Sequence, residues 1–135
     1  PDAKGYEVAG FFWWQGERDC GSAALSSRYE QNLVKLIETL RKDFNCPNAP
    51  FVMGTLGEAV KGQSQGNTTT VMQAMFNVDG ESGKYPQFKG NVATVYTHPM
   101  AQGGSGNGHY SGKAEVYMDV GIEMGKAMAK MLQGK

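Results

Sequence analysis

The chain has 135 residues, of which 13 are basic and 13 are acidic, so its formal net charge at pH 7 is zero. This length suits one domain or part of one, and the balanced charge offers no bulk attraction to nucleic acid or to an anionic membrane. No apolar run approaches the roughly 20 residues of a membrane-spanning helix. We therefore expect neither a nucleic-acid partner nor a membrane partner.

The first residues and the cysteines say little about the cellular compartment. The chain opens on Pro1 with no initiator methionine or targeting segment, as if cut from something longer. Cys20 and Cys46 are too few for a disulfide scaffold, and no Cys-x-x-Cys spacing pairs them for zinc. They could form one bridge in an oxidising compartment or stay as free, partly buried thiols.

The first apolar segment predicts a buried strand that ends in polar groups. Residues 7–14 are rich in β-branched and aromatic side chains and are apolar on both faces after Val8, which is typical of a central parallel strand. Gln15, Gly16 and Glu17 follow at once. An open α/β sheet presents its chemistry at the carboxyl ends of its strands, so Gln15 and Glu17 are candidates to serve a reaction centre. An ordinary polar turn is the alternative.

Further helices and strands follow in alternation. After a loop at 20–27, the Ser27-x-x-Glu30 pattern has the form of a capping box, and apolar residues at three- and four-residue steps predict a helix to about Phe44. The remaining predictions are a strand at 51–56, a polar loop at 57–67, a helix at 68–78 capped by Asn67 or Thr68, a loop at 79–90, a strand at 91–97 and a glycine-rich loop. A final helix from about Ser111 to Leu132 carries a methionine-rich apolar stripe that indicates core packing, formed by Tyr117, Val120, Met124, Met128 and Met131.

The order β-α-β-α-β-α predicts an α/β fold with a parallel sheet and right-handed crossovers. Three strands make a thin sheet, because sheets of this kind usually have about five. We therefore expect further strands to come from upstream of Pro1 or from another chain.

Both histidines follow predicted strands or loops at the same edge of the sheet. His109 lies where the glycine-rich loop meets the last helix, a useful position for a general base, although a surface histidine is the plainer interpretation. His98 follows the third strand and is interpreted as mainly structural. Gln15 could donate to a developing oxyanion, and Glu17 could orient a histidine and stabilise its imidazolium form.

The chain offers no convincing nucleophile. It contains no Gly-x-Ser-x-Gly elbow, Ser64 lies in the middle of a loop, and Ser111 is placed as a helix cap. Neither cysteine has a strongly electropositive neighbourhood. No spacing groups His98 and His109 with carboxylates, so we expect no metal and no cofactor.

Two motifs carry a family resemblance. Residues 13–19, Trp-Trp-Gln-Gly-Glu-Arg-Asp, resemble the tryptophan-glutamine-glycine-glutamate-x-aspartate motif of the sialate O-acetylesterase domain, related to carbohydrate esterase family six within the SGNH hydrolases. His109-Tyr110-Ser111 and the helix after it are similar to that family's histidine block. The resemblance implies a three-layer α/β/α flavodoxin-like fold, of which this chain holds the later β-α units, and serine-dependent removal of acetyl groups from carbohydrate.

By this resemblance, Gln15 is an oxyanion-hole donor, His109 the general base and Glu17 the carboxylate partner of His109. Trp14 and Tyr110 are candidate aromatics facing the substrate. The chain departs from the family in two ways. The Gly-Gln-Ser-Asn nucleophile block and the glycine block are absent, and the aspartate that many relatives have three residues before the histidine is Gly106 here, which leaves the orienting role to Glu17.

These departures lead us to expect that residues 1–135 are the carboxyl-terminal part of a single SGNH-type esterase domain. Acting on acetylated carbohydrate would require an upstream segment or a second chain to supply the serine, and the isolated chain should be nearly inactive with one apolar sheet edge exposed. The resemblance favours an extracellular or periplasmic setting. The competing hypothesis is a non-catalytic carbohydrate-binding or interaction module with the same fold.

Overall fold

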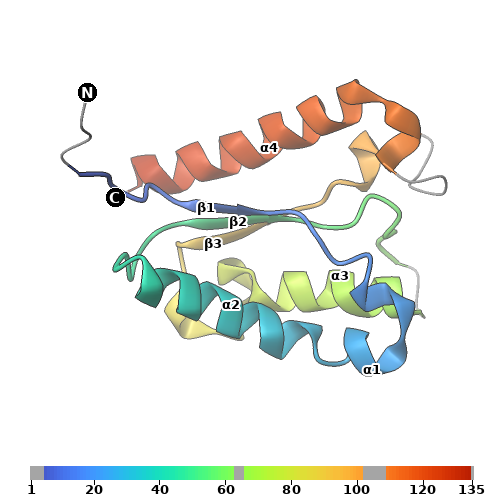
Figure 1. Cartoon of the computed structure of the whole chain (residues 1–135), viewed down its shortest axis with the longest axis horizontal. Coiled ribbons are helices and arrows are strands. Elements are labelled where there is room, and N and C mark those ends of the chain that lie inside the picture. Colours follow the sequence, from blue (N-terminus) through green and yellow to red (C-terminus); the bar gives the residue numbers. More distant parts are fainter. Residues whose placement is uncertain (1–4, 63–65, 102–108, 135) are drawn as a thin grey trace.

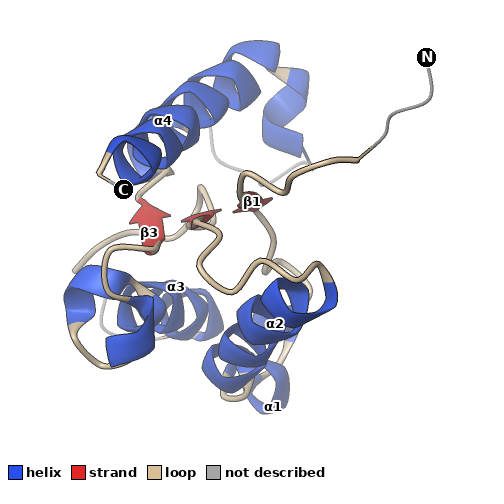
Figure 2. Ribbon diagram, turned by 90° about the vertical axis from the view of Figure 1, so that its left-hand side faces the viewer, coloured by secondary structure: helices blue, strands red, loops and turns tan. Residues whose placement is uncertain are grey.

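The computed structural model describes residues 5–62, 66–101 and 109–134, and within them it shows an α/β fold around one parallel sheet. The strands β1 (Phe11–Trp13), β2 (Phe51–Gly54) and β3 (Val92–Val95) lie in the order β1-β2-β3. Helix α4 (Ala114–Gln133) covers one face, while α2 (Tyr29–Asp43) and α3 (Asn67–Val78) cover the other, as Figures 1 and 2 show. The predicted α/β class is confirmed, and the arrangement is that of a partial flavodoxin-like sheet.

Strand β1 is shorter than predicted and lies at the edge of this sheet rather than at its centre. The Phe11 N–H donates to the Pro50 carbonyl over 2.8 Å, and Phe11 pairs with Phe51 in the parallel register. Within the described part of the chain, residues 5–10 have no neighbouring strand to pair with, because the chain leading into β2 turns through residues 45–49. The buried central strand is therefore β2. The expected apolar edge is present, since Phe12 leaves 56% of its surface exposed.

The segment predicted as a loop at 20–27 instead forms two short helices. Residues Asp19–Gly21 form a 3₁₀ turn, and α1 (Ala23–Ser26) begins at Ser22, whose hydroxyl accepts the Leu25 N–H. The predicted capping box is wrong. Because α1 runs almost directly into α2, the Ser27 hydroxyl bonds back to Ala24 and Arg28 takes the N-cap position without a side-chain bond.

The last helix also begins later than predicted. Residues His109–Gly112 form a separate 3₁₀ turn, and α4 starts only at Ala114 with Lys113 at its N-cap. Ser111 is therefore not the helix cap. Its φ of 61° lies in the left-handed region. A right-handed helix requires negative φ values, so it cannot include Ser111 in this conformation.

The core is divided between the two faces of the sheet. On one face the side chains of α2 and α3 pack against Phe51 and Met53, and on the other α4 packs its predicted stripe of Val120, Met124 and Met128 near Val52. Alternation along β2 explains the division, because successive strand residues point to opposite faces. Of the predicted stripe, Val120, Met124 and Met128 are therefore core, whereas Met131 is half-buried and Tyr117 is exposed.

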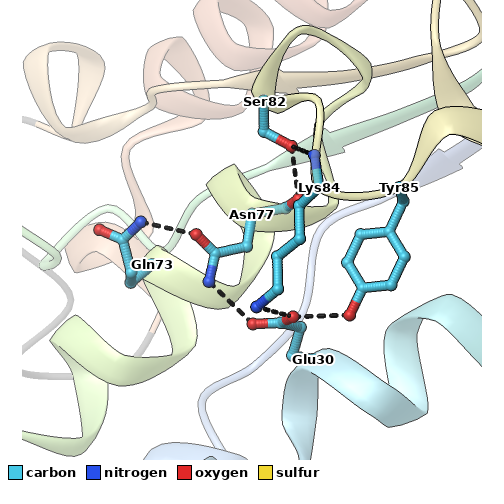
Figure 3. Close-up of polar contacts among 6 residues, drawn as sticks. All are labelled: Glu30, Gln73, Asn77, Ser82, Lys84 and Tyr85. Atoms are coloured by element: carbon cyan, nitrogen blue, oxygen red, sulfur yellow. Dashed lines mark hydrogen bonds and ion pairs between the residues drawn. The ribbon is translucent and has the colours of Figure 1, made fainter.

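A polar cluster fastens the segment between α3 and β3 to the two helices on its face. Figure 3 shows its members, of which Glu30 lies on α2 and Asn77 on α3. The Glu30 carboxylate accepts hydrogen bonds from Asn77 Nδ2 at 2.8 Å and from the Tyr85 hydroxyl at 2.6 Å, and it pairs with Lys84 Nζ at 2.6 Å. The Ser82 hydroxyl donates to the Asn77 carbonyl at 2.6 Å. Residues 79–90, predicted as a loop, also contain the 3₁₀ turns Gly80–Ser82 and Pro86–Phe88.

Cys20 and Cys46 are both free and half-buried. Of the two alternatives that the sequence leaves open, the structure therefore shows separate thiols.

Candidate functional site

The carboxyl ends of the strands meet at one edge of the sheet, which hydrogen bonds between β2 and β3 hold together. The Thr97 hydroxyl donates to the Thr55 carbonyl at 2.6 Å, and the Thr97 N–H donates to the Thr55 hydroxyl at 3.1 Å. Both threonines are fully buried, so these bonds satisfy polar groups that would otherwise be costly to bury. The segments that follow β2 and β3 are therefore held together where they leave the sheet.

The turn after β1 depends on Gly16. Its φ is +155°, and a Cβ there would lie 3.0 Å from Val71 Cγ1, so a side chain is opposed by both backbone conformation and packing. The Gly16 carbonyl accepts the Cys20 N–H at 3.1 Å, which closes the turn. Glu17 is exposed, and its Oε2 accepts the Gly16 N–H at 3.1 Å.

The structure fixes Gln15 through both its backbone and its side chain. The hydroxyl of the buried Tyr29 donates to the Gln15 carbonyl at 2.7 Å, while Gln15 Nε2 donates to Asp19 Oδ2 at 3.0 Å. Gln15, Asp19 and Tyr29 line a cavity of about 240 Å³ together with Trp13 and residues of α2. Gln15 therefore lies at the predicted edge with its amide orientation defined.

His109 is exposed, and its neighbour Tyr110 anchors it at this edge. Tyr110 leaves only 4% of its surface exposed; its hydroxyl accepts the Gly57 N–H at 3.3 Å, and its ring stacks on Trp14 with centroids 5.3 Å apart. The backbone φ is positive at both His109 and Tyr110, which is uncommon outside glycine. The Trp14–Tyr110 stack thus joins the exit of β1 to the segment that carries His109.

The structure brings some of the predicted site residues together and leaves others apart. Trp14 and Tyr110 contact each other directly, whereas no hydrogen bond or ion pair joins Glu17 to His109 among the described residues. Burial is the main cause that raises the pKa of Tyr110 to about 12, the Gly57 hydrogen bond lowers it, and the charges of Glu58 and Glu17 add to the rise.

Trp14 and Tyr110, the aromatic residues predicted to face the substrate, mainly contact other residues of the protein. Trp14 Nε1 donates to the Thr55 carbonyl at 2.9 Å, and Tyr117 packs edge-on against both Trp14 and Tyr110. Because Tyr110 is buried, its ring is a packing surface in this structure rather than an open platform. A role for half-buried Trp14 toward substrate stays a prediction.

His98 has the structural environment that the sequence indicates. Its Nδ1 lies 2.7 Å from the Gly57 carbonyl oxygen. A carbonyl can only accept, so Nδ1 carries the hydrogen. His98 thereby helps hold the segment after β2, on which Tyr110 also rests.

Sequence reasoning missed the roles of Asp19, Glu58 and Tyr117. The signal for Asp19 is its position four residues after Gln15, because a tight turn brings residues at this spacing together. Glu58 gave no signal, because it lies in a segment predicted as a polar loop; its Oε2 is buried and has no hydrogen-bond partner among the described residues. Tyr117 was assigned only to the apolar stripe of the last helix.

None of the residues weighed as nucleophiles gains support at this edge. Ser64 lies outside the described residues, as does Gly106, where many relatives have an aspartate, and Ser111 lies in the turn before α4. Burial raises the pKa of the Cys20 thiol, and a hydrogen bond with Thr68 opposes this by lowering it. The nearby carboxylates, led by Glu58, raise the pKa further, so the reactive thiolate is disfavoured.

Within the described ranges, no group of three or more histidine, cysteine or acidic side chains is arranged to hold a metal ion. No described helix has the length and apolarity to cross a membrane.

The comparisons with known proteins concern the family and the fold of the chain. A family model described as "Carbohydrate esterase, sialic acid-specific acetylesterase" matches residues 2–132. The fold is similar to that of an Arabidopsis thaliana protein of known crystal structure, with a TM-score of 0.60 and 26% identity over 93% of this chain. The match spans 44% of that protein's chain, so this chain corresponds to less than half of it. No curated protein matches the sequence. Because the family model covers nearly all 135 residues, the chain belongs to the sialic acid-specific acetylesterase family of carbohydrate esterases.

Proposed function

We propose that this chain carries part of the active site of a carbohydrate O-acetylesterase, with Gln15 as oxyanion donor, His109 as general base and Glu17 as its carboxylate partner. The observation that carries the proposal is the Trp14–Tyr110 stack. It holds the turn bearing Gln15 and Glu17 and the segment bearing His109 at the same edge of the sheet, within a chain of the esterase family.

The reaction follows from these roles. A serine hydroxyl attacks the acetyl carbonyl while His109 takes its proton, and the Gln15 amide donates to the oxygen that becomes negative. Collapse of the tetrahedral intermediate returns the proton to the sugar oxygen and leaves an acetyl-serine. Water, deprotonated by His109, then releases acetate and regenerates the serine. Glu17 accepts from the other ring N–H when the exposed side chains of Glu17 and His109 turn toward each other.

We assign the serine to an upstream segment of the polypeptide or to a second chain. The free side of β1 supports this assignment, because a strand added there in parallel would deliver its carboxyl end next to Gln15. The similar Arabidopsis structure, whose chain is more than twice as long as the matched part, leaves room for such a segment.

A chromogenic acetate ester tests the proposal. We expect residues 1–135 alone to be nearly inactive and the polypeptide that includes the upstream segment to hydrolyse the ester. His109→Ala in that active form should lower kcat by roughly 100- to 10,000-fold. Lys126→Ala, an exposed change on α4 far from the site, is the matched control and should leave kcat unchanged. Robust turnover by residues 1–135 that disappears in Ser64→Ala or Ser111→Ala would contradict the missing-serine account.

A second candidate function is supported by the separation of Glu17 and His109. The half-buried Trp14 and the exposed Tyr117, which pack edge-on beside polar side chains, would bind a sugar face without any chemistry. Binding to an acetylated glycan array with no ester hydrolysis, even by the longer polypeptide, would favour this non-catalytic carbohydrate-binding role over the esterase.

A further inference from the structure

Gln15 can serve as an oxyanion donor only if the nitrogen end of its amide, not the oxygen end, faces the reacting carbonyl. The two ends have nearly the same shape, so packing alone does not distinguish them. An amide turned the wrong way would place a partial negative charge against the developing oxyanion. The active orientation therefore has to be set by a neighbouring group.

Asp19 is that neighbouring group. Its Oδ2 lies 3.0 Å from Gln15 Nε2, and an ionised carboxylate can only accept hydrogen bonds. The oxygen end of the Gln15 amide cannot occupy this position without opposing a carboxylate. One hydrogen of the NH₂ group is thus held by Asp19, while the second hydrogen is engaged by no partner among the described residues.

The surrounding residues keep Asp19 and Gln15 in register. The Gly16 conformation and the bond from Cys20 N–H to the Gly16 carbonyl fold the turn so that the fourth residue after Gln15 returns to it. The Tyr29 hydroxyl, which also lies 3.3 Å from Trp13 Nε1, fixes the Gln15 carbonyl. Arg18 precedes the 3₁₀ turn at its N-cap position and makes no side-chain capping bond.

We propose that Asp19 is a positioning residue that sets the polarity of the Gln15 amide, so that Gln15 presents an N–H to the oxyanion. The proposal rests on the proposed esterase function, and it assigns a role to the last residue of the motif at 13–19. Burial raises the pKa of Tyr29 and so keeps it a hydrogen-bond donor to the Gln15 carbonyl. Asp19 acts through Gln15 and needs no contact with the substrate.

The first test examines the amide itself in residues 1–135 and requires no activity. In ¹⁵N-edited NMR spectra, the two Gln15 Nε2 hydrogens should be more widely separated in chemical shift than those of a solvent-exposed glutamine amide, because only one is held by a carboxylate. Asp19→Asn allows the amide to turn over, so the separation should shrink. Asp19→Glu keeps an acceptor-only partner and should restore much of it. Asp43→Asn, at the far end of α2, removes the same charge and should have no effect. An unchanged Gln15 pair in Asp19→Asn overturns the proposal.

The second test uses the active, longer polypeptide and an acetate ester. Asp19→Asn should lower kcat by at least about ten-fold, up to the roughly 100- to 1,000-fold expected for losing the donor itself, with little change in KM. Gln15→Ala should be as slow with Asp19→Asn as without it, since Asp19 acts only through Gln15. Additive losses in the double variant overturn the proposal. If Gln15→Ala keeps full activity, the proposed function fails instead, and the NMR result alone then decides what Asp19 does.

Discussion

At the scale of single residues, close contact decides which glycines are required. Gly57 lies under the ring that anchors the His109 segment: a Cβ at this position would lie 2.5 Å from Ala101 Cβ and 2.6 Å from Tyr110 Cε1. Real Cβ atoms do not come this close to other heavy atoms, so a side chain at position 57 must displace the Tyr110 ring from its packed position. Gly121 on α4 is the opposite case, because a Cβ there meets no atom within 4 Å.

We therefore expect Gly57→Ala to lower the free energy of unfolding by roughly 1–3 kcal/mol, as overpacking of a filled site does. Gly121→Ala should raise it by up to about 1 kcal/mol, because alanine favours a helix interior. Chemical denaturation of both variants measures the difference. Equal stabilities for Gly57→Ala and the unchanged chain would show that Tyr110 yields without cost.

At the scale of elements, the Glu30 cluster connects α2 to α3 and to the segment leading into β3. Burial acts to raise the pKa of Glu30, but hydrogen bonds from Asn77, Lys84 and Tyr85, with the Lys84 charge, outweigh it and hold the pKa below its ordinary value. A carboxyl group whose pKa is depressed by folding stabilises the folded state above its unfolded pKa. This contribution is lost as the pH falls through the depressed folded value.

The matching prediction concerns Glu30→Gln. At pH 7 this change should lower the free energy of unfolding by roughly 0.5–1.5 kcal/mol, a modest figure because Lys84 is half exposed and water screens the pair. The difference from the unchanged chain should shrink as the pH falls below the ordinary carboxyl pKa and should vanish below the folded one. Glu38→Gln, an exposed change on the same helix, is the control. A pH-independent difference would contradict the ionic origin of the effect.

At the scale of the whole molecule, the two edges of the sheet differ: the Thr94 N–H of the β3 edge donates to Asp79 Oδ2 at 2.6 Å, whereas β1 pairs only with β2 among the described strands. Strand β1 lies at the edge, and Phe12, Trp13 and Trp14 line a groove of about 430 Å³ with Gly121 and Met124 of α4. Parallel sheets normally have both faces and both edges covered, because their strands are apolar throughout. We therefore expect the exposed β1 edge to favour association of residues 1–135.

We expect sedimentation of residues 1–135 to show self-association that rises with protein concentration. Phe12→Lys should reduce it, because charge on an edge strand opposes pairing with another chain. Leu25→Lys, which changes an exposed apolar residue on α1, is the matched control and should not reduce it. A strictly monomeric unchanged chain at high concentration would contradict this expectation.

The sequence predicts much of this fold because its periodic patterns are strong. Apolar steps of three and four residues predict α2, and the apolar run at 51–56 predicts β2, which ends at Gly54. Local signals mislead where tertiary contacts compete with them. Ser27 and Glu30 match a capping box, yet Glu30 binds Asn77 and Tyr85, which are distant in the sequence. The start of α4 was placed too early because nothing in the sequence marks the positive φ values before it.

The sequence by itself determined the α/β class, the order of the elements and the motif that places Gln15 and Glu17 after the first strand, because periodicity and motif spacing are local properties of a chain. The tertiary structure decided that β1 is an edge strand, that Tyr110 is buried against Gly57 and Trp14, and that Asp19 holds the Gln15 amide. Edge position and burial depend on neighbours brought together only by folding. The direction of a side-chain amide depends on a single acceptor 3.0 Å away, which the turn at Gly16 brings into place.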